Sequence, residues 1–375
     1  MTRLESIAIS GFKSIGRRQD IVFGDVTVFL GANGAGKSNV ISFLKMLNSL
    51  TTSGLQVFIA KNGMANAILH FGSVQTKTIS FEIRLSEEAC SVLYQAGLSF
   101  GMPDSLFFSH ECVKACKEGC GAPFEKELSS TGRSESALRD GEKLDGEEAY
   151  ICDVIKVLLS NLRVFQFHDT SDTSGLRASS YVENTQHLMS DAGNLPAFLY
   201  AMKKNHPRHY RRIVQHVHMM IPQFEDFRLA PSQNNPQLIF LNWIGEKGEE
   251  YLFGPHQLSD GSSRFISLTA LLLQPKETMP DVIVLDEPEL GLHPAAISSL
   301  AEMIALAKQN CQVILATQSP DLANQFSADD IVIVEYDKVE NESSYRRLNK
   351  EVLKDWLRDY SIEELWEKNV LGGRP

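Results

Sequence analysis

The feature that most constrains this chain is the run Gly31-Ala-Asn-Gly-Ala-Gly-Lys-Ser38, which fits the pattern G-x-x-x-x-G-K-[ST]. The segment 26–30 (VTVFL) precedes it and predicts a buried strand. Residues 39–50 follow it, and their apolar side chains predict one face of a helix. A strand, this loop and a helix form the context in which the motif binds phosphate. The sequence therefore predicts a phosphate-binding loop in an α/β domain.

The residue types of the loop suit this chemistry. Gly31, Gly34 and Gly36 let the backbone turn tightly, so that its N–H groups face phosphate oxygens. The start of the helix adds unpaired N–H donors and a positive dipole end. We expect Lys37 to reach the β- and γ-phosphates of ATP and the Ser38 hydroxyl to ligate Mg²⁺.

A second acidic motif follows a second buried strand. Four apolar residues, 282–285, predict the strand, and Asp286 and Glu287 come directly after it. At the carboxyl end of a strand beside the phosphate loop, Asp286 can hold the Mg²⁺ shell. Glu287 can then position and polarise the attacking water. Together the two motifs predict a nucleotide hydrolysis site.

Composition sets the broad class. The chain has 375 residues, 43% of them hydrophobic, which allows one large domain or one with a sizeable insertion. A net charge of −11 argues against a generally basic DNA-coating surface. No apolar run approaches the roughly 18–20 residues of a membrane span. The charged start and six cysteines are typical of a cytoplasmic protein without membrane association.

Patterning along the chain predicts three parts. Residues 1–85 read as the first half of the ATPase domain, with an edge strand at 4–9 and an antiparallel strand at 74–85. Glycines, acids and serines accumulate after residue 86, so 86–160 reads as an inserted, partly mobile arm. Residues 161–375 form the second half, where short apolar runs at 282–285, 313–316 and 331–334 predict parallel strands.

The run LSDGSS at 258–263 precedes a strongly apolar helix. Ser259 or Asp260 makes a good N-cap, and Gly261 lets a ligand approach the backbone. A helix start of this kind is a second anion site, although a plain N-cap explains the same residues.

Together, GANGAGKSN, LSDGSS, VIVLDEPELGLHP and ATQSP resemble the ABC-type ATPase heads of the SMC, RecF and OLD group. More narrowly, the chain resembles the stand-alone bacterial AAA-family ATPases of that group. The resemblance includes the opening residues 7–14, the segment 164–171 and the tail 365–375. It implies an α/β P-loop NTPase head of the ABC type, with an antiparallel β subdomain and an inserted helical arm.

The resemblance also implies a shared site, in which two heads form a homodimer around two ATP molecules. One subunit holds the phosphates, and Ser259 and Gly261 of the other touch the γ-phosphate. Asp286 serves Mg²⁺, Glu287 activates water, and residues 289–292 cross the interface as a D-loop. The implied phosphate-binding residues are Gly31, Ala32, Asn33, Gly34, Ala35, Gly36, Lys37, Ser38 and Asn39.

Three further polar residues each have a candidate role. Gln318 stands where transporter ATPases carry a switch histidine, and we assign it with Lys37 and Glu287 to catalysis. Gln166 is the candidate Q-loop residue for Mg²⁺ or water, and a strand residue without a ligand is the alternative. The position of His293 indicates a structural role in a loop.

Two further clusters carry open alternatives. The four-residue spacing of Cys112, Cys116 and Cys120 would place them along one face of a helix. A single tetrahedral zinc ion could not reach all three unless the helix breaks. The alternative interpretation is that they are free thiols. The basic residues of 203–212 favour a solvated helix face, with a DNA or partner contact as the alternative.

The resulting hypothesis is an ATP-hydrolysing switch, for which the resemblance implies a role in DNA repair or anti-phage defence. About forty residues follow Val334, too few for a fused nuclease domain, so we expect a separate effector, for which a nuclease is the candidate. Contact with nucleic acid would then be indirect. Two rival hypotheses are the ATPase subunit of an ABC transporter and an ATP-bound scaffold with little turnover.

Overall fold

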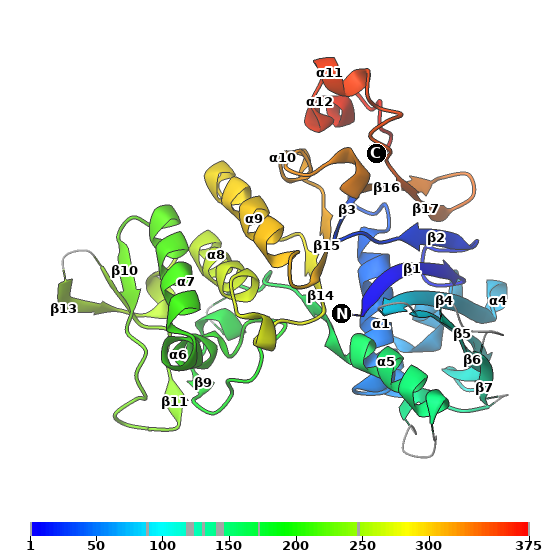
Figure 1. Ribbon diagram of the computed structural model, residues 1–375, viewed down its shortest axis with the longest axis horizontal. Coiled ribbons are helices and arrows are strands. Elements are labelled where there is room, and N and C mark those ends of the chain that lie inside the picture. Colours follow the sequence, from blue (N-terminus) through cyan, green and yellow to red (C-terminus); the bar gives the residue numbers. More distant parts are fainter. Residues whose placement is uncertain are drawn as a thin grey trace.

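The computed structural model describes residues 2–87, 90–117, 124–129, 132–139, 146–171, 173–245 and 248–373. Figure 1 shows two large sheets at the right and centre, with a group of helices and short strands at the left. The nucleotide motifs lie on the central sheet, so this sheet positions the candidate site.

The central sheet has six strands in the order β17-β16-β3-β15-β14-β8. All neighbours run parallel except β17, which pairs antiparallel with β16 at the edge. The three apolar runs therefore form parallel strands as predicted. The strands are β3 (Val26–Leu30), β8 (Leu162–Phe165), β14 (Val282–Asp286), β15 (Gln312–Thr317), β16 (Ile331–Asp337) and β17 (Glu342–Arg347).

Both faces of this sheet are covered, because successive strand side chains point to opposite sides. Val282 and Val284 join one core with α1 (Lys37–Thr51) and α5 (Glu147–Asn161). Ile283 and Leu285 join the other core with α8 (Asp260–Leu272) and α9 (Pro294–Ala307). Burial on both faces explains why the strand sequences are continuously apolar.

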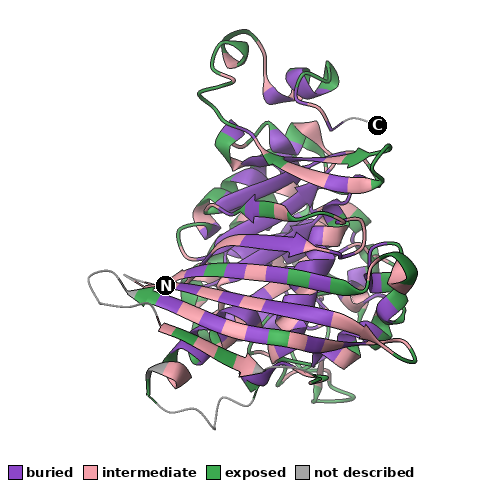
Figure 2. Cartoon of the chain, turned by 90° about the vertical axis from the view of Figure 1, so that its right-hand side faces the viewer, coloured by how far each residue is buried: buried purple, intermediate pink, exposed green. Residues whose placement is uncertain are grey.

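The second sheet is antiparallel, in the order β2-β1-β4-β5-β6-β7. Figure 2 shows buried and exposed residues alternating along its strands, as expected when one face packs on α1 and α5 and the other faces outward. The strand predicted at 4–9 forms as β1, but the prediction of an edge position is wrong, because β1 lies between β2 and β4. The strands are β1 (Arg3–Ser10), β2 (Gln19–Val22), β4 (Thr78–Glu87), β5 (Cys90–Gly101), β6 (Ser105–Lys117) and β7 (Phe124–Ser129).

Among the described residues, the inserted helical arm expected after residue 86 is α-helical only in α5, and the residues before α5 differ from this expectation. The described residues up to 129 are mainly strands that extend the antiparallel sheet, and α5 is the long helix of the insert. The reason is a two-residue period: Val92, Tyr94, Ala96 and Leu98 are buried on one face of β5. The division at 86 and 160 stays a prediction.

Two of the three clustered cysteines lie on a strand of the insert. Cys112 and Cys116 lie on β6, so the expected helix stripe is wrong, and Cys120 lies outside the described residues. Among the described residues, no group of three or more His, Cys, Asp or Glu side chains could hold a metal ion. The structure therefore adds no support for zinc at this cluster.

The group at the left of Figure 1 contains α6 (Leu195–Asn205) and α7 (Pro207–Met220), and Pro207 begins the second of these helices. In the same group β12 pairs with β13, while β11 pairs with β9. These strands are β9 (Ser180–Tyr181), β10 (Phe224–Phe227), β11 (Leu238–Ile239), β12 (Trp243–Gly245) and β13 (Gly248–Phe253).

Short helices complete the described chain, and none of the helices described is both long and apolar enough to cross a bilayer. The short helices are α2 (Leu55–Lys61), α3 (Met64–Ile68), α4 (Gly72–Gln75), α10 (Pro320–Ala323), α11 (Trp356–Asp359) and α12 (Ile362–Glu367).

Candidate nucleotide-binding site

The phosphate-binding loop at 31–38, the Walker A motif, joins the end of β3 to the start of α1. Gly34 and Gly36 have φ values of +80° and +115°, a region that side chains other than glycine rarely adopt. Lys37 is buried and its Nζ donates to the carbonyl oxygens of Gly31 (2.7 Å) and Ala32 (3.0 Å). Ser38 is exposed at the first turn of α1. The lysine is thus held inside the loop while the hydroxyl is accessible.

Side chains of strand β17 form hydrogen bonds with the backbone of the phosphate-binding loop. Ser343 Oγ donates to the carbonyl of Ala35 (2.7 Å), and the Tyr345 hydroxyl donates to the carbonyl of Gly36 (3.0 Å). Asn39 Nδ2 donates to Ser14 Oγ (2.5 Å), which is hydrogen-bonded to Ser343 Oγ (2.6 Å). These contacts hold the backbone of the loop in place.

A comparison of two glycine variants tests this support. A Cβ at Gly36 would lie 2.2 Å from Ser343 Oγ, whereas a Cβ at Gly34 meets nothing within 4 Å. Both positions have positive φ, so both variants strain the backbone, and Gly36→Ala, at the larger φ, adds the collision to that strain. We expect Gly36→Ala to lower the free energy of unfolding by about 1–3 kcal/mol more than Gly34→Ala. Urea denaturation of both variants measures this, and equal losses would contradict the role of β17.

The tail of the chain contacts the same loop. The backbone N–H of Ala32 donates to the Gly373 carbonyl (3.1 Å), and the N–H of Gly373 donates to Glu335 Oε1 (2.7 Å). Gly373 packs so closely on Trp366 that a Cβ there would lie 2.6 Å from its ring. The loop is therefore linked to α12 through residue 373.

The Walker B aspartate is held by a relay of side chains. Asp286 is buried at the end of β14, and its Oδ2 accepts a hydrogen bond from Gln166 Nε2 (2.6 Å). Gln166 Oε1 in turn accepts from Lys45 Nζ on α1 (2.7 Å). His168 Nε2 lies 2.8 Å from the Asp286 carbonyl oxygen. The structure thus brings Gln166 to Asp286, and its contact with Mg²⁺ or water stays a prediction.

Glu287 adopts a left-handed backbone, with φ of +42°. Its N–H donates to the carbonyl of Ala316 at 2.8 Å, which ties the turn to β15. Non-glycine residues in this region are strained, and such strain persists where the surroundings determine the conformation. A strained acidic residue directly after Asp286 is consistent with a positioned catalytic base.

Burial and neighbouring charges act in opposite directions on the pKa of Lys37. Burial lowers the pKa of Lys37, and the nearby carboxylates of Glu287, Asp286 and Glu289 act in the opposite direction. Burial raises the pKa of Glu289, whose Oε1 accepts from Thr317 Oγ1 at 2.5 Å. Gln318 follows Thr317 at the end of β15, so the predicted switch residue lies beside the predicted D-loop.

The segment 258–263 (LSDGSS), here called the signature turn, leads into α8. Ser259 Oγ accepts from the N–H of Ser262 (3.2 Å), which makes Ser259 the N-cap. A Cβ at Gly261 would lie 2.5 Å from the carbonyl oxygen of Gly291, so this turn packs on the D-loop. Within the described residues, no hydrogen bond or ion pair joins the turn to 31–39. His293 caps α9 through Nδ1, which confirms its structural role.

Sequence reasoning missed several supporting residues. Arg264 on α8 donates to the carbonyls of Phe167 (2.9 Å), His168 (2.8 Å) and Leu290 (2.8 Å), and so joins three motifs. Nothing in its local pattern distinguishes it from a surface arginine. Lys45 carried a weak signal, because it lies about two helical turns beyond Lys37 on α1.

The residues present fit ATP and Mg²⁺. Fixed backbone donors at the start of α1 and the cationic Lys37 suit phosphate oxygens. The Ser38 hydroxyl and the Asp286 carboxylate supply the oxygen ligands that Mg²⁺ prefers.

Residues 167–324 match the family described as "AAA domain, putative AbiEii toxin, Type IV TA system". The chain is 32% identical over 118 residues to the energy-coupling factor transporter ATP-binding protein EcfA of Methanosphaera stadtmanae, a match that covers 30% of this chain and 41% of that protein. It is 33% identical over 98 residues to the molybdenum import ATP-binding protein ModC of Mycobacterium tuberculosis, 25% of each chain. The chain thus spans less than half the length of these curated relatives.

Two solved structures share the fold over nearly their whole length. An SMC head bound to the C-winged helix domain of ScpA has a TM-score of 0.56 and 16% identity, covering 94% of this chain and 99% of that one. The SMC head of Pyrococcus furiosus bound to the C-terminal domain of ScpA has a TM-score of 0.54 and 13% identity, covering 96% and 99%. The motifs and these sequence matches together identify an ABC-type P-loop ATPase, and the solved structures show that it has the fold of an SMC head.

Proposed function

We propose that this ATPase is a switch in which two copies close head to head around ATP and separate after hydrolysis. The observation that carries the proposal is that the described residues form no hydrogen bond or ion pair between the start of α8 and the phosphate-binding loop. Lys37, Ser38, Asp286 and Glu287 gather at the central sheet, whereas Ser259 and Gly261 start α8 and form no hydrogen bond or ion pair with 31–39 among the described residues. A second copy would bring its own α8 to the loop.

In this proposal each residue of the chain has one task. Lys37 neutralises charge on the phosphates, and Mg²⁺, when bound, neutralises more of it. Glu287 orients water and accepts its proton, with its backbone held by Ala316. Ser259 and Gly261 of the second copy place a helix start against the γ-phosphate. Nucleotide drives closure because it would contact both halves only in the dimer.

The expected result for the unmodified chain is a doubling of mass on addition of ATP and Mg²⁺. ATP turnover per chain should rise with protein concentration until dimerisation saturates, since one copy holds half the site. Light scattering and phosphate release, measured over the same concentration series, check both points. A turnover per chain that stays constant down to the lowest concentration, with monomer mass throughout, would contradict the shared site.

For the biological role we propose work with a separate effector in DNA repair or anti-phage defence. The solved SMC heads are bound to domains of ScpA, which supports a partner on a head of this fold. Purifying the tagged chain with and without ATP and identifying the co-purified protein tests this. A nuclease retained only with ATP would support it.

A transporter subunit is the second candidate, because the curated relatives are named as transporter ATP-binding proteins. Asp260 in place of a glycine and Gln318 in place of a histidine favour the switch over this candidate. Stable recovery of the chain with the membrane fraction, dependent on a membrane partner, would favour transport.

A further inference from the structure

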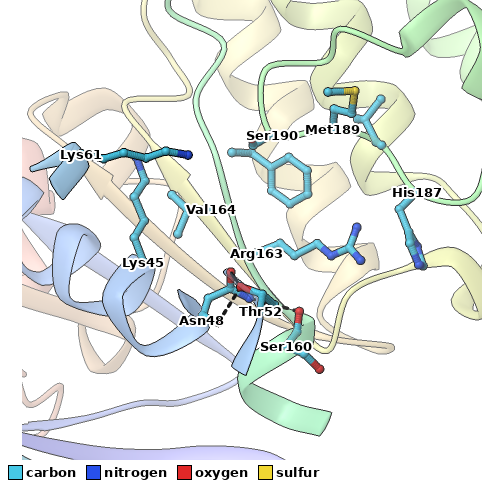
Figure 3. A pocket seen from close by; sticks show the side chains of 12 residues that line it. Lys45, Asn48, Thr52, Lys61, Ser160, Arg163, Val164, His187, Met189 and Ser190 are labelled. Carbon is cyan, nitrogen blue, oxygen red and sulfur yellow. Dashed lines mark hydrogen bonds between the residues drawn. The ribbon is translucent and has the colours of Figure 1, made fainter. Parts of the chain in front are cut away.

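A cavity of about 560 Å³ lies outside the nucleotide motifs. It is bounded by α1, the end of α2, β8 and the segment 187–190, as the close-up in Figure 3 shows. This volume is within the range of pockets that take small molecules. The cavity is therefore large enough for a ligand of mononucleotide size.

The lining is basic. Lys45, Lys61, Arg163 and His187 line it, together with polar and apolar residues and no aspartate or glutamate. Figure 3 shows Lys45 and Lys61 on one side and Arg163 and His187 on the other. A chain with a net charge of −11 has thus gathered cations around one hollow. Such an arrangement favours a multiply charged anion.

Two of these cations have no partner in the described part of the chain. Arg163 is half-buried on β8, where burial lowers its pKa, and no hydrogen bond or ion pair offsets the loss of water. Lys61 at the end of α2 is exposed and equally unpaired there. A bound phosphate group would give the guanidinium the charge-assisted hydrogen bonds that it lacks.

The cavity is connected to the nucleotide site through one residue, Gln166. Lys45, which lines the cavity, donates to Gln166 Oε1 (2.7 Å), and the Gln166 N–H donates to the carbonyl of Ser190 (2.9 Å), another lining residue. Gln166 Nε2 donates to Asp286 Oδ2 (2.6 Å). A ligand that draws Lys45 away or moves Ser190 would therefore change the hold on Asp286.

We infer that this cavity binds a small phosphate-bearing anion, held by Arg163, Lys61 and Lys45, and that its occupancy changes ATP turnover through Gln166. The binding part is independent of the proposed function, and the effect on turnover rests on it.

The binding test uses inorganic pyrophosphate as the probe, without Mg²⁺, in a Lys37→Ala background that weakens binding at the Walker A loop. Titration calorimetry should show one site per chain. We expect Arg163→Gln and Lys61→Gln each to raise the dissociation constant about tenfold or more, because each removes a charged hydrogen-bond donor. Arg208→Gln, which removes an exposed charge on α7, is the matched control and should change it less than about twofold.

The outcomes separate cleanly. Loss of binding in the two cavity variants but not in Arg208→Gln supports the site, and Lys61→Gln, at an exposed position, keeps the test valid should Arg163→Gln unfold. Equal binding in all variants, or no binding at all, would overturn it. Displacement of pyrophosphate by AMP would identify the natural ligand as a free nucleotide. Displacement only by a 5′-phosphorylated oligonucleotide would identify it as a nucleic-acid end. Either result supports the site.

The coupling test adds pyrophosphate at saturating ATP, with Mg²⁺ in excess of both, to the chain with Lys37 intact. We expect at least a twofold change in ATP turnover that is absent in Arg163→Gln, when each protein is compared with its own turnover without pyrophosphate. Binding without this change would overturn the coupling alone. A chain with no ATP turnover would contradict the proposed function and leave the binding result standing.

Discussion

Glu287→Gln is expected to bind ATP with nearly unchanged affinity and to hydrolyse it at least about 100-fold more slowly, the usual scale for loss of a general base. Glutamine has the same size and can keep the hydrogen bond from the residue 287 N–H to Ala316. What it loses is the ability to accept a proton from water. The dimer would open only after hydrolysis. Because hydrolysis is slow in this variant, the closed dimer should accumulate.

Equilibrium binding of labelled ATP, phosphate release and light scattering on the same sample measure this prediction. Glu302→Gln removes an exposed carboxylate from α9 and serves as the control, since it should leave all three quantities unchanged. A Glu287→Gln chain that turns over ATP at close to the wild-type rate would show that another group activates the water. A chain that hydrolyses slowly but stays monomeric with ATP would contradict the head-to-head arrangement.

Mixing Lys37→Ala with Ser259→Arg should restore activity that neither variant has alone. Lys37→Ala removes the charge that the loop holds next to the phosphates, and Ser259→Arg fills the start of α8. In a mixed dimer, one of the two composite sites has an intact loop and an intact signature turn. Random pairing across a two-fold interface makes half the dimers mixed, so the expected activity is about a quarter of wild type.

The matched control mixes Lys37→Ala with Asp286→Ala. Both changes fall on the same half of the site, so each composite site in a mixed dimer carries one defect and no activity should return. Phosphate release at equal total protein compares the two mixtures. Activity of the first mixture that never exceeds the sum of its separate variants would indicate a site completed within one subunit.

The nucleotide motifs and the parallel sheet could be predicted because local pattern determines them. A strand buried on both faces must be continuously apolar, as 282–285 and 313–316 are, and glycines with positive φ mark the loop. The insert could not be predicted equally well. Its strands carry polar residues on the outward face, and its glycines and acids masked the two-residue period of β5.

The residues that hold the site in place could not be predicted from the sequence, for a different reason. Ser343 and Lys45 act through residues far from them in the sequence, Ala35 and Gln166 respectively. A pattern read along the chain contains no sign of such contacts, because they depend on which strand ends beside which helix. Arg264 is similar, since it joins carbonyl groups of separate segments. Spatial neighbours of this kind emerge only once the sheets are assembled.

The packing of Gly373 on Trp366 gives the molecule an optical reporter of its own. The chain has three tryptophans, and Trp366 is the one that packs on the residue hydrogen-bonded to Ala32. Its indole is buried, so small displacements of Gly373 alter the surroundings of a fluorophore that needs no labelling. Emission from Trp366, isolated by replacing Trp243 and Trp356 with phenylalanine, would follow the nucleotide loop in real time.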